Sequence, residues 1–157
     1  MKTHSYAVTL RWTGNLGTGN ATYRGYARDH EISGDGKATI AGSSDPAFRG
    51  DPSRWNPEEL FIASVAGCHK LWYLHLCLDA GIVVEDYVDH ATGEMAEHPD
   101  GSGEITSVML RPEVTISAES DAELAAAIHG KVGAICFIAR SVKCEIHHEP
   151  VIRKSGA

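Results

Sequence analysis

The chain has 157 residues, of which 43% are hydrophobic and 22% are charged, so it can form a hydrophobic core and is not expected to be disordered. Its formal net charge is −7 and lysine and arginine form no cluster, which argues against nucleic acid as a partner because phosphate binding needs a basic surface. We predict a single globular domain over residues 1–157.

The N-terminus and the cysteine content bear on the cellular compartment. The first residues, MKTHSYAVTLRW, lack the basic start and the apolar run of a signal peptide. Four cysteines without such a signal predict the reducing cytoplasm, where thiols are structural, metal-binding or catalytic rather than parts of a disulfide framework.

The N-terminal part of the chain is predicted to be rich in β-strands. Apolar and polar residues alternate over residues 6–12, which predicts a half-buried strand. After the loop GNLGTG, which has neither a dinucleotide-binding nor a P-loop pattern, we expect a second strand over residues 20–28. The Asp35-Gly36 turn predicts a hairpin of residues 30–33 and 37–40.

Two arginines lie on the second predicted strand. Arg24 and Arg28 would share one strand face with Tyr26 because strand side chains alternate. They are the only cations that we expect to be buried, and a buried arginine needs a carboxylate partner. Positive charge of this kind is what converts a neighbouring thiol to its reactive thiolate.

One long helix is predicted over residues 55–81, after an irregular loop over residues 42–55. Asn56 is a favoured N-cap, Glu59 can complete a capping box with it, and Gly81 is expected to end the helix. Apolar side chains occur on every side of the helical wheel, which predicts a helix buried in the core.

The composition and length of the same helix indicate whether it spans a membrane and whether it packs against a second subunit. Its apolar run is interrupted by four polar residues, His69, Lys70, His75 and Asp79. This argues against a membrane span. At 1.5 Å per residue it spans roughly 36 Å, more than a domain of this size covers alone. We therefore expect a partner subunit.

The C-terminal part is predicted to hold a second buried helix among strands. Strands are expected over residues 83–98, 108–116 and 142–147, before an exposed tail over residues 153–157. Ser120 and Glu123 predict a capping box for the second helix, which we expect to continue through ICFIARS. The element order predicts an α+β fold with two central buried helices packed on an antiparallel sheet.

The cysteines are the first candidates for chemistry. Cys68 and Cys136 are each expected near the middle of one of the two buried helices, so their sulfurs could meet if the helices pack together. A buried free cysteine is also often an inert small hydrophobe, an interpretation that suits Cys77 and Cys144 better. Cys144 and His148 share a strand face, but no second ligand pair with metal spacing lies nearby, and we predict no metal site.

Two other polar residues of the long helix have simpler interpretations. His75 lies seven residues from Cys68, about 10.5 Å of helix rise, which is too far for a hydrogen bond and favours a packed or interface histidine. Glu58 lies in the first turn, where the helix dipole favours a carboxylate.

The motif NPEELFIASVAGC resembles the helix of the OsmC/Ohr family of hydroperoxide reductases, in which NPE and an apolar stretch precede the reactive cysteine. The family's glutamate stands ten residues before that cysteine, which points to Glu58. The stretch AICFIARS is similar to the family's CPYS-like motif but keeps only Cys136, so the chain resembles an OsmC-like branch rather than a typical Ohr. The family's arginine is commonly followed by aspartate, which favours Arg28 in RDH and leaves Arg24 as the alternative.

The resemblance implies an OsmC-like fold in an intertwined homodimer, with an active site at the dimer interface. It implies a thiol-dependent peroxidase of oxidative or osmotic stress defence that reduces hydroperoxides, organic ones above all. Arg28, held by Glu58, would stabilise the thiolate of Cys68, which becomes a sulfenic acid and then a disulfide with Cys136. A thiol or lipoyl-type reductant would restore both thiols, and no bound cofactor is expected. An apolar lining of the active site by Phe61, Trp72 and Phe137 would suit organic rather than small inorganic peroxides.

Two other function classes stay open. A non-catalytic OsmC-like dimer could bind a small molecule or act in a stress response, and an inert dimer could keep its cysteines as packing residues. Consumption of two thiols in an intramolecular disulfide on addition of an alkyl hydroperoxide distinguishes the enzyme from both.

Overall fold

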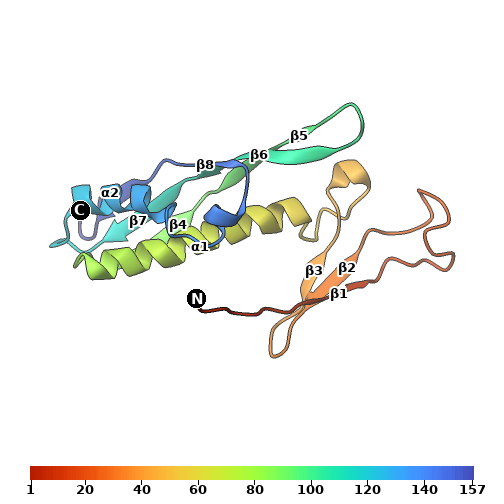
Figure 1. The fold of residues 1–157 in the computed structure, drawn as a ribbon, viewed down its shortest axis with the longest axis horizontal. Helices are drawn as coiled ribbons and strands as arrows, with labels where there is room; N and C mark the ends of the chain where they lie inside the picture. Colours follow the sequence, from red (N-terminus) through yellow and green to blue (C-terminus); the bar gives the residue numbers. More distant parts are fainter. The chain divides into compact units, whose positions relative to one another are not determined.

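The N-terminal unit of the chain is organised on a three-stranded antiparallel sheet. A computed structural model describes all 157 residues and divides them into two units, Met1–Leu60 and Phe61–Ala157. In the first unit the strands β1 (Thr9–Trp12), β2 (His30–Ser33) and β3 (Ile40–Gly42) pair in the order β1-β2-β3 (Figure 1). The predicted hairpin turn at Asp35-Gly36 is confirmed, since Gly36 has a φ of 68°. The prediction of one domain over the whole chain stays a prediction.

The expected strand over residues 20–28 is wrong, because this segment forms turns and bends. β1 pairs with β2 instead. Two backbone hydrogen bonds join the ends of the loop between them, from the Thr13 N–H to the Asp29 carbonyl and from the Ala27 N–H to the Gly14 carbonyl. The Asn15 side chain accepts from the N–H groups of Gly17 and Gly19, both at 2.9 Å, and so organises the glycine-rich turn. These local side-chain hydrogen bonds replace the strand ladder that alternation alone predicted.

The predicted long helix is present as α1 (Pro57–Asp79), and it follows a loop that holds the short helix η1 (Pro46–Phe48). The capping box is confirmed: the Glu59 N–H donates to Asn56 Oδ1 at 2.8 Å, and the Asn56 N–H donates to the Glu59 carboxylate at 3.1 Å. Gly81, with a φ of 73°, follows the helix end as expected.

The expectation that α1 is buried on every side is wrong for a single chain. Its buried side chains form one stripe at a spacing of four residues, made of Val65, His69, Tyr73 and Cys77. On another face Leu71 and Leu78 are 63% and 73% exposed. The reason is that the sheets and second helix of one chain cover only one side of α1.

By length and composition α1 is apolar enough to cross a membrane. This is weak evidence, because the core helix of a soluble protein passes the same test. The sequence-based prediction that α1 does not span a membrane stays a prediction.

The C-terminal unit contains two three-stranded sheets. Their strands are β4 (Val84–Asp89), β5 (Thr92–Glu97), β6 (Gly103–Leu110), β7 (Pro112–Ile116), β8 (Glu145–His148) and β9 (Val151–Lys154). The orders are β4-β7-β9 and β5-β6-β8, so each long predicted strand is present but divided between the two sheets. Pro112 is the first residue of β7, a position where a strand tolerates the missing N–H.

Two expectations about these sheets are wrong. The sheets are not purely antiparallel, since β8 runs parallel to β6 and β9 parallel to β7. The expected tail over residues 153–157 is wrong in that residues 153 and 154 belong to β9, whose Ile152 lies opposite Val114, although both of their side chains are exposed as predicted. A parallel partner far along the chain leaves no turn signal in the sequence, which is why local patterns did not reveal it.

The second helix, α2 (Ala122–Val132), is shorter than predicted. Asp121 is its N-cap, whereas the hydroxyl of Ser120 accepts from the Val83 N–H at 3.0 Å. Glycines at 130 and 133 weaken helix propagation, and the chain turns after Val132 before the short helix η2 (Ala139–Ser141). Cys136 therefore lies in the turn after α2 rather than in the middle of a helix.

The main core joins α1 and α2 to the sheet β4-β7-β9. Its fully buried side chains include Tyr73, Ile116 and Ile128. The hydroxyl of Tyr73 donates to the carbonyl of Ala125 at 3.0 Å, which satisfies a buried polar group while it ties the two helices together. This packing brings the middle of α1 to the end of α2.

Candidate active site

Two cysteines meet where α1 passes the end of α2. The thiol of Cys136 points at Cys68, with the two sulfur atoms 2.6 Å apart, and all four cysteines of the chain are free. A disulfide bond measures about 2.05 Å, so a small movement would close one. The expectation that these two sulfurs meet is confirmed, although Cys136 reaches this place from a turn.

The two thiols have different surroundings. Cys136 is 1% exposed, whereas Cys68 is partly exposed. Burial raises the pKa of the Cys136 thiol, and its hydrogen bond to Cys68 raises this pKa further, while the Ala139 N–H at 3.5 Å opposes the shift. Cys136 is therefore protonated near neutral pH, which makes the accessible Cys68 the better candidate for the first nucleophile.

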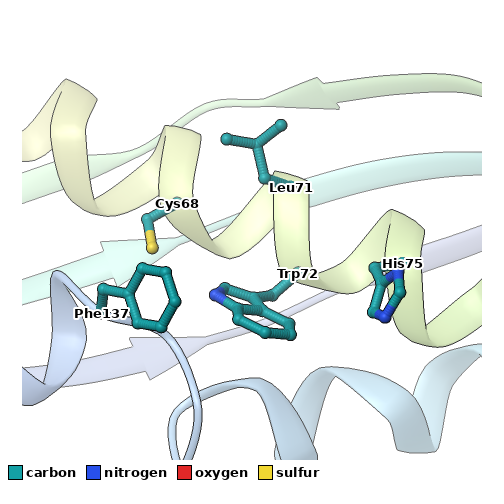
Figure 2. A pocket seen from close by; sticks show the side chains of 5 residues that line it. All are labelled: Cys68, Leu71, Trp72, His75 and Phe137. Atoms are coloured by element: carbon teal, nitrogen blue, oxygen red, sulfur yellow. The ribbon is translucent and has the colours of Figure 1, made fainter. Parts of the chain in front are cut away.

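Cys68 opens into an apolar pocket of about 340 Å³ (Figure 2). The pocket is lined by Cys68, Leu71, Trp72, His75 and Phe137. Four of these residues lie on one face of α1 at helical spacing, and Phe137 faces them from the turn after α2, edge to face with Trp72 at 5.4 Å. The pocket suits the apolar part of a small molecule that brings a reactive group to the Cys68 sulfur.

The predicted lining is partly correct. Trp72 and Phe137 line the pocket as expected, but Phe61 lies at a different pocket beside Cys144. His75 makes no hydrogen bond to Cys68 and instead faces Asp79 at 3.6 Å, yet its ring borders the same pocket as the cysteine. Residues 68 and 75 are seven positions apart and so lie on one face of the helix. This spacing is the sequence signal that both side chains border the same pocket.

A buried histidine pair lies close to the cysteines, since His69 and Cys136 border the same cavity. The sequence analysis did not predict this pair. His69 Nε2 and His129 Nδ1 are 2.9 Å apart, and the His129 ring stacks on Tyr73 with centroids 3.8 Å apart. Burial lowers the pKa of His69 to about 4 and that of His129 to about 3, so both rings are neutral at pH 7. The four-residue spacing of Val65, His69 and Tyr73 was the available signal.

The predicted arginine and glutamate belong to the N-terminal unit. Arg28 donates to the carbonyls of Tyr23 and Tyr26, both at 2.8 Å, and its guanidinium lies over both tyrosine rings. Arg24 is exposed. Glu58 lies in the first turn of α1, and no ion pair joins it to Arg28 within one chain. Their expected roles at the thiolate stay predictions.

The structure contains no group of three or more histidine, cysteine, aspartate or glutamate side chains arranged to hold a metal ion. The thiol that lines the pocket is that of Cys68.

The chain is similar to proteins of one family. The family described as OsmC-like protein matches residues 50–150. An OsmC-like protein of unknown function from Vibrio cholerae is 28% identical, with a TM-score of 0.84 over 95% of this chain and 100% of that one. No curated protein matches the chain.

Two further structures show the same fold at lower identity. The organic hydroperoxide resistance protein OhrB of Bacillus subtilis is 19% identical, with a TM-score of 0.64 over 96% of this chain and 98% of that one. An organic hydroperoxide resistance protein OsmC from Legionella pneumophila is 16% identical, with a TM-score of 0.68 over 97% and 98% of the two chains.

The buried histidine pair predicts that the protein loses stability on acidification. The pair has pKa values near 4 and 3 in the folded chain and an ordinary value near 6.5 in the unfolded chain, so between these values the unfolded chain binds more protons. The free energy of unfolding should therefore fall from pH 7 to pH 5, by on the order of 2 kcal/mol for each histidine. Urea titrations at the two pH values measure this difference.

In those titrations His129→Gln should remove a large part of the pH dependence, because glutamine does not titrate. His147→Gln is the matched control, since this side chain is exposed. An equal pH dependence in the two variants would contradict the assignment.

Proposed function

We propose a function from one premise: this chain belongs to the OsmC-like protein family, whose match covers more than half of its residues. The function is that of a thiol-dependent peroxidase that reduces hydroperoxides, in oxidative or osmotic stress defence in the cytoplasm. The observation that carries it is the pair of free thiols, 2.6 Å apart, of which that of Cys68 lines an apolar pocket.

In the proposed reaction the Cys68 thiolate attacks the O–O bond of the hydroperoxide. The S–O bond forms as the O–O bond breaks, the alkoxide takes a proton and leaves as an alcohol, and Cys68 becomes a sulfenic acid. Cys136 then attacks the Cys68 sulfur, the S–S bond forms, and the hydroxyl leaves as water. An external dithiol, of a thiol or lipoyl type, returns two electrons by exchange, so the cycle needs no bound cofactor.

The pocket favours organic over inorganic hydroperoxides. Its lining offers aliphatic and aromatic surface from Leu71, Trp72 and Phe137, which gains free energy by covering an alkyl or acyl group and little by covering hydrogen peroxide. Two structures with this fold are named organic hydroperoxide resistance proteins, which agrees with this substrate class.

We further propose that Arg28 stabilises the Cys68 thiolate and that Glu58 orients the arginine. A guanidinium cannot lose its proton, and the rings and carbonyls around Arg28 already hold its charge in one place. We place this arrangement in a homodimer, whose existence the exposed apolar side chains of α1 support.

Replacement of each cysteine tests the two roles. Cys68→Ser should abolish reduction of an alkyl hydroperoxide, because no thiolate remains to attack the O–O bond. Cys136→Ser should consume about one equivalent of hydroperoxide and accumulate the sulfenic acid of Cys68, which mass spectrometry after trapping detects. Continued turnover of Cys136→Ser with a dithiol would show that the pairing is wrong, and no disulfide in the wild type would favour a non-catalytic binding dimer.

Replacement of the arginine tests the activation of Cys68. Arg28→Ala should lower the thiolate fraction of Cys68 at pH 7 by on the order of tenfold, and Glu58→Ala should do so less severely. The pH dependence of alkylation at Cys68 measures this. Arg24→Ala is the matched control. If Arg24→Ala alone shifts the alkylation curve, Arg24 rather than Arg28 activates Cys68. If neither variant shifts it, the proposed activation of Cys68 by an arginine is wrong.

The homodimer predicts a defined mass in solution. At micromolar concentration analytical ultracentrifugation should give twice the chain mass of 16.9 kDa. Leu78→Glu should shift the protein toward the monomer, because it places a charge on the exposed apolar face of α1. Val151→Glu, on β9, is the control, since this side chain is exposed on another element. A wild-type monomer would refute the proposal.

A further inference from the structure

Cys136 borders a second cavity that the proposed peroxide chemistry does not use. This cavity has a volume of about 210 Å³, and its side chains that can exchange a proton are those of Cys136, His69 and His148. The rest of its lining is aliphatic or glycine, without a carboxylate, lysine or arginine. A cavity of this size and polarity can hold several water molecules.

Three histidines from three elements lie close together, and two of them, His69 and His148, border this cavity. The ring centroids of His69 on α1 and His129 on α2 lie 5.3 Å apart, and His148 at the end of β8 lies 5.9 and 6.1 Å from them. His69 and His129 share a hydrogen bond, and the buried Nε2 of His129 has no partner. His148 differs from the other two because it is exposed to solvent.

The resolving step, in which Cys136 attacks the Cys68 sulfenic acid, needs a proton acceptor near Cys136. Cys136 is a buried thiol that must lose its proton to attack the Cys68 sulfenic acid, and the departing hydroxyl must gain one. His75 borders the other pocket, on the Cys68 side. The only ionisable neighbours of Cys136 in the second cavity are His69 and His148.

We infer that His148 accepts the proton of Cys136 through water in this cavity. The Cys136 thiolate then forms the S–S bond as the S–O bond of Cys68 breaks. The hydroxide takes a proton from solvent in the pocket on the Cys68 side and leaves as water, and the exposed His148 releases its proton to solvent. This step needs no outside oxidant or reductant. It deepens the proposed function and rests on it, because it assigns Cys136 the resolving role.

The other two histidines are less suited to accept this proton. Burial holds both rings neutral, with the pKa of His69 near 4, so neither competes for a proton at pH 7. His69 Nε2 is also engaged by His129, which does not border the cavity. Both rings lie beside His148, with centroids 5.9 and 6.1 Å from its own.

The test uses an aromatic disulfide whose released thiolate absorbs visible light, so that proton removal from Cys136 is measured without a peroxide. Cys77 and Cys144 are first replaced by serine, which leaves two reactive thiols. The first thiolate is released when Cys68 is modified, and the second when Cys136 attacks the resulting mixed disulfide. His148→Asn should leave the first phase within about twofold and slow the second about tenfold or more.

Two controls separate proton transfer from a structural effect. His147→Asn changes the neighbouring exposed histidine of β8 and should leave both phases unchanged. His148→Ala opens room at the cavity, and added imidazole should restore its second phase, which a purely structural loss would not allow. An unchanged second phase in His148→Asn, or a slow phase in His148→Ala that imidazole does not restore, would overturn the inference.

A parallel experiment with an alkyl hydroperoxide separates this inference from the proposed function. His148→Asn should form the Cys68 sulfenic acid at the wild-type rate and close the disulfide slowly. If wild-type protein forms no disulfide with the hydroperoxide while the two aromatic-disulfide phases respond as expected, the peroxidase proposal fails, and what stands is the removal of the Cys136 proton by His148.

Discussion

The contact between α1 and α2 is the constraint on which the candidate site depends. Two buried hydrogen bonds fix the helices side by side, from the Tyr73 hydroxyl to the Ala125 carbonyl and between His69 and His129. Each polar group would be costly to bury alone, so the helices are stable in the register that pairs them. That register leaves Cys68 facing the turn after α2, where Cys136 lies 2.6 Å away.

The thiol pair separates two environments of opposite character. On the Cys68 side lies an apolar pocket, partly open to solvent, that suits an organic group. On the Cys136 side lies a smaller cavity with histidine rings, which suits water and protons. The two proposed half-reactions need these different surroundings, because oxidation requires a substrate to approach and resolution requires a proton to move. The pair of free thiols lies at the boundary between the two.

The apolar surface that one chain leaves exposed has a structural cause. α1 is apolar on all sides, but one chain covers only the stripe that includes Val65 and Tyr73. Exposed leucines on such a helix favour association with a second copy. The guanidinium of Arg28 is held by two carbonyls and two aromatic rings, which is why we propose it as the fixed positive charge beside the thiolate in such an assembly.

Local signals in the sequence determined α1 with its capping box at Asn56, the Asp35-Gly36 turn and the α+β order, because each depends on residues close together in the chain. The tertiary structure alone decided what depends on distant partners. Parallel pairing placed β9 beside β7, the turn after Val132 carried Cys136 to Cys68, and the packing of α1, α2 and β8 gathered three histidines. Such contacts are fixed by burial between elements far apart in the sequence, and no local pattern encodes them.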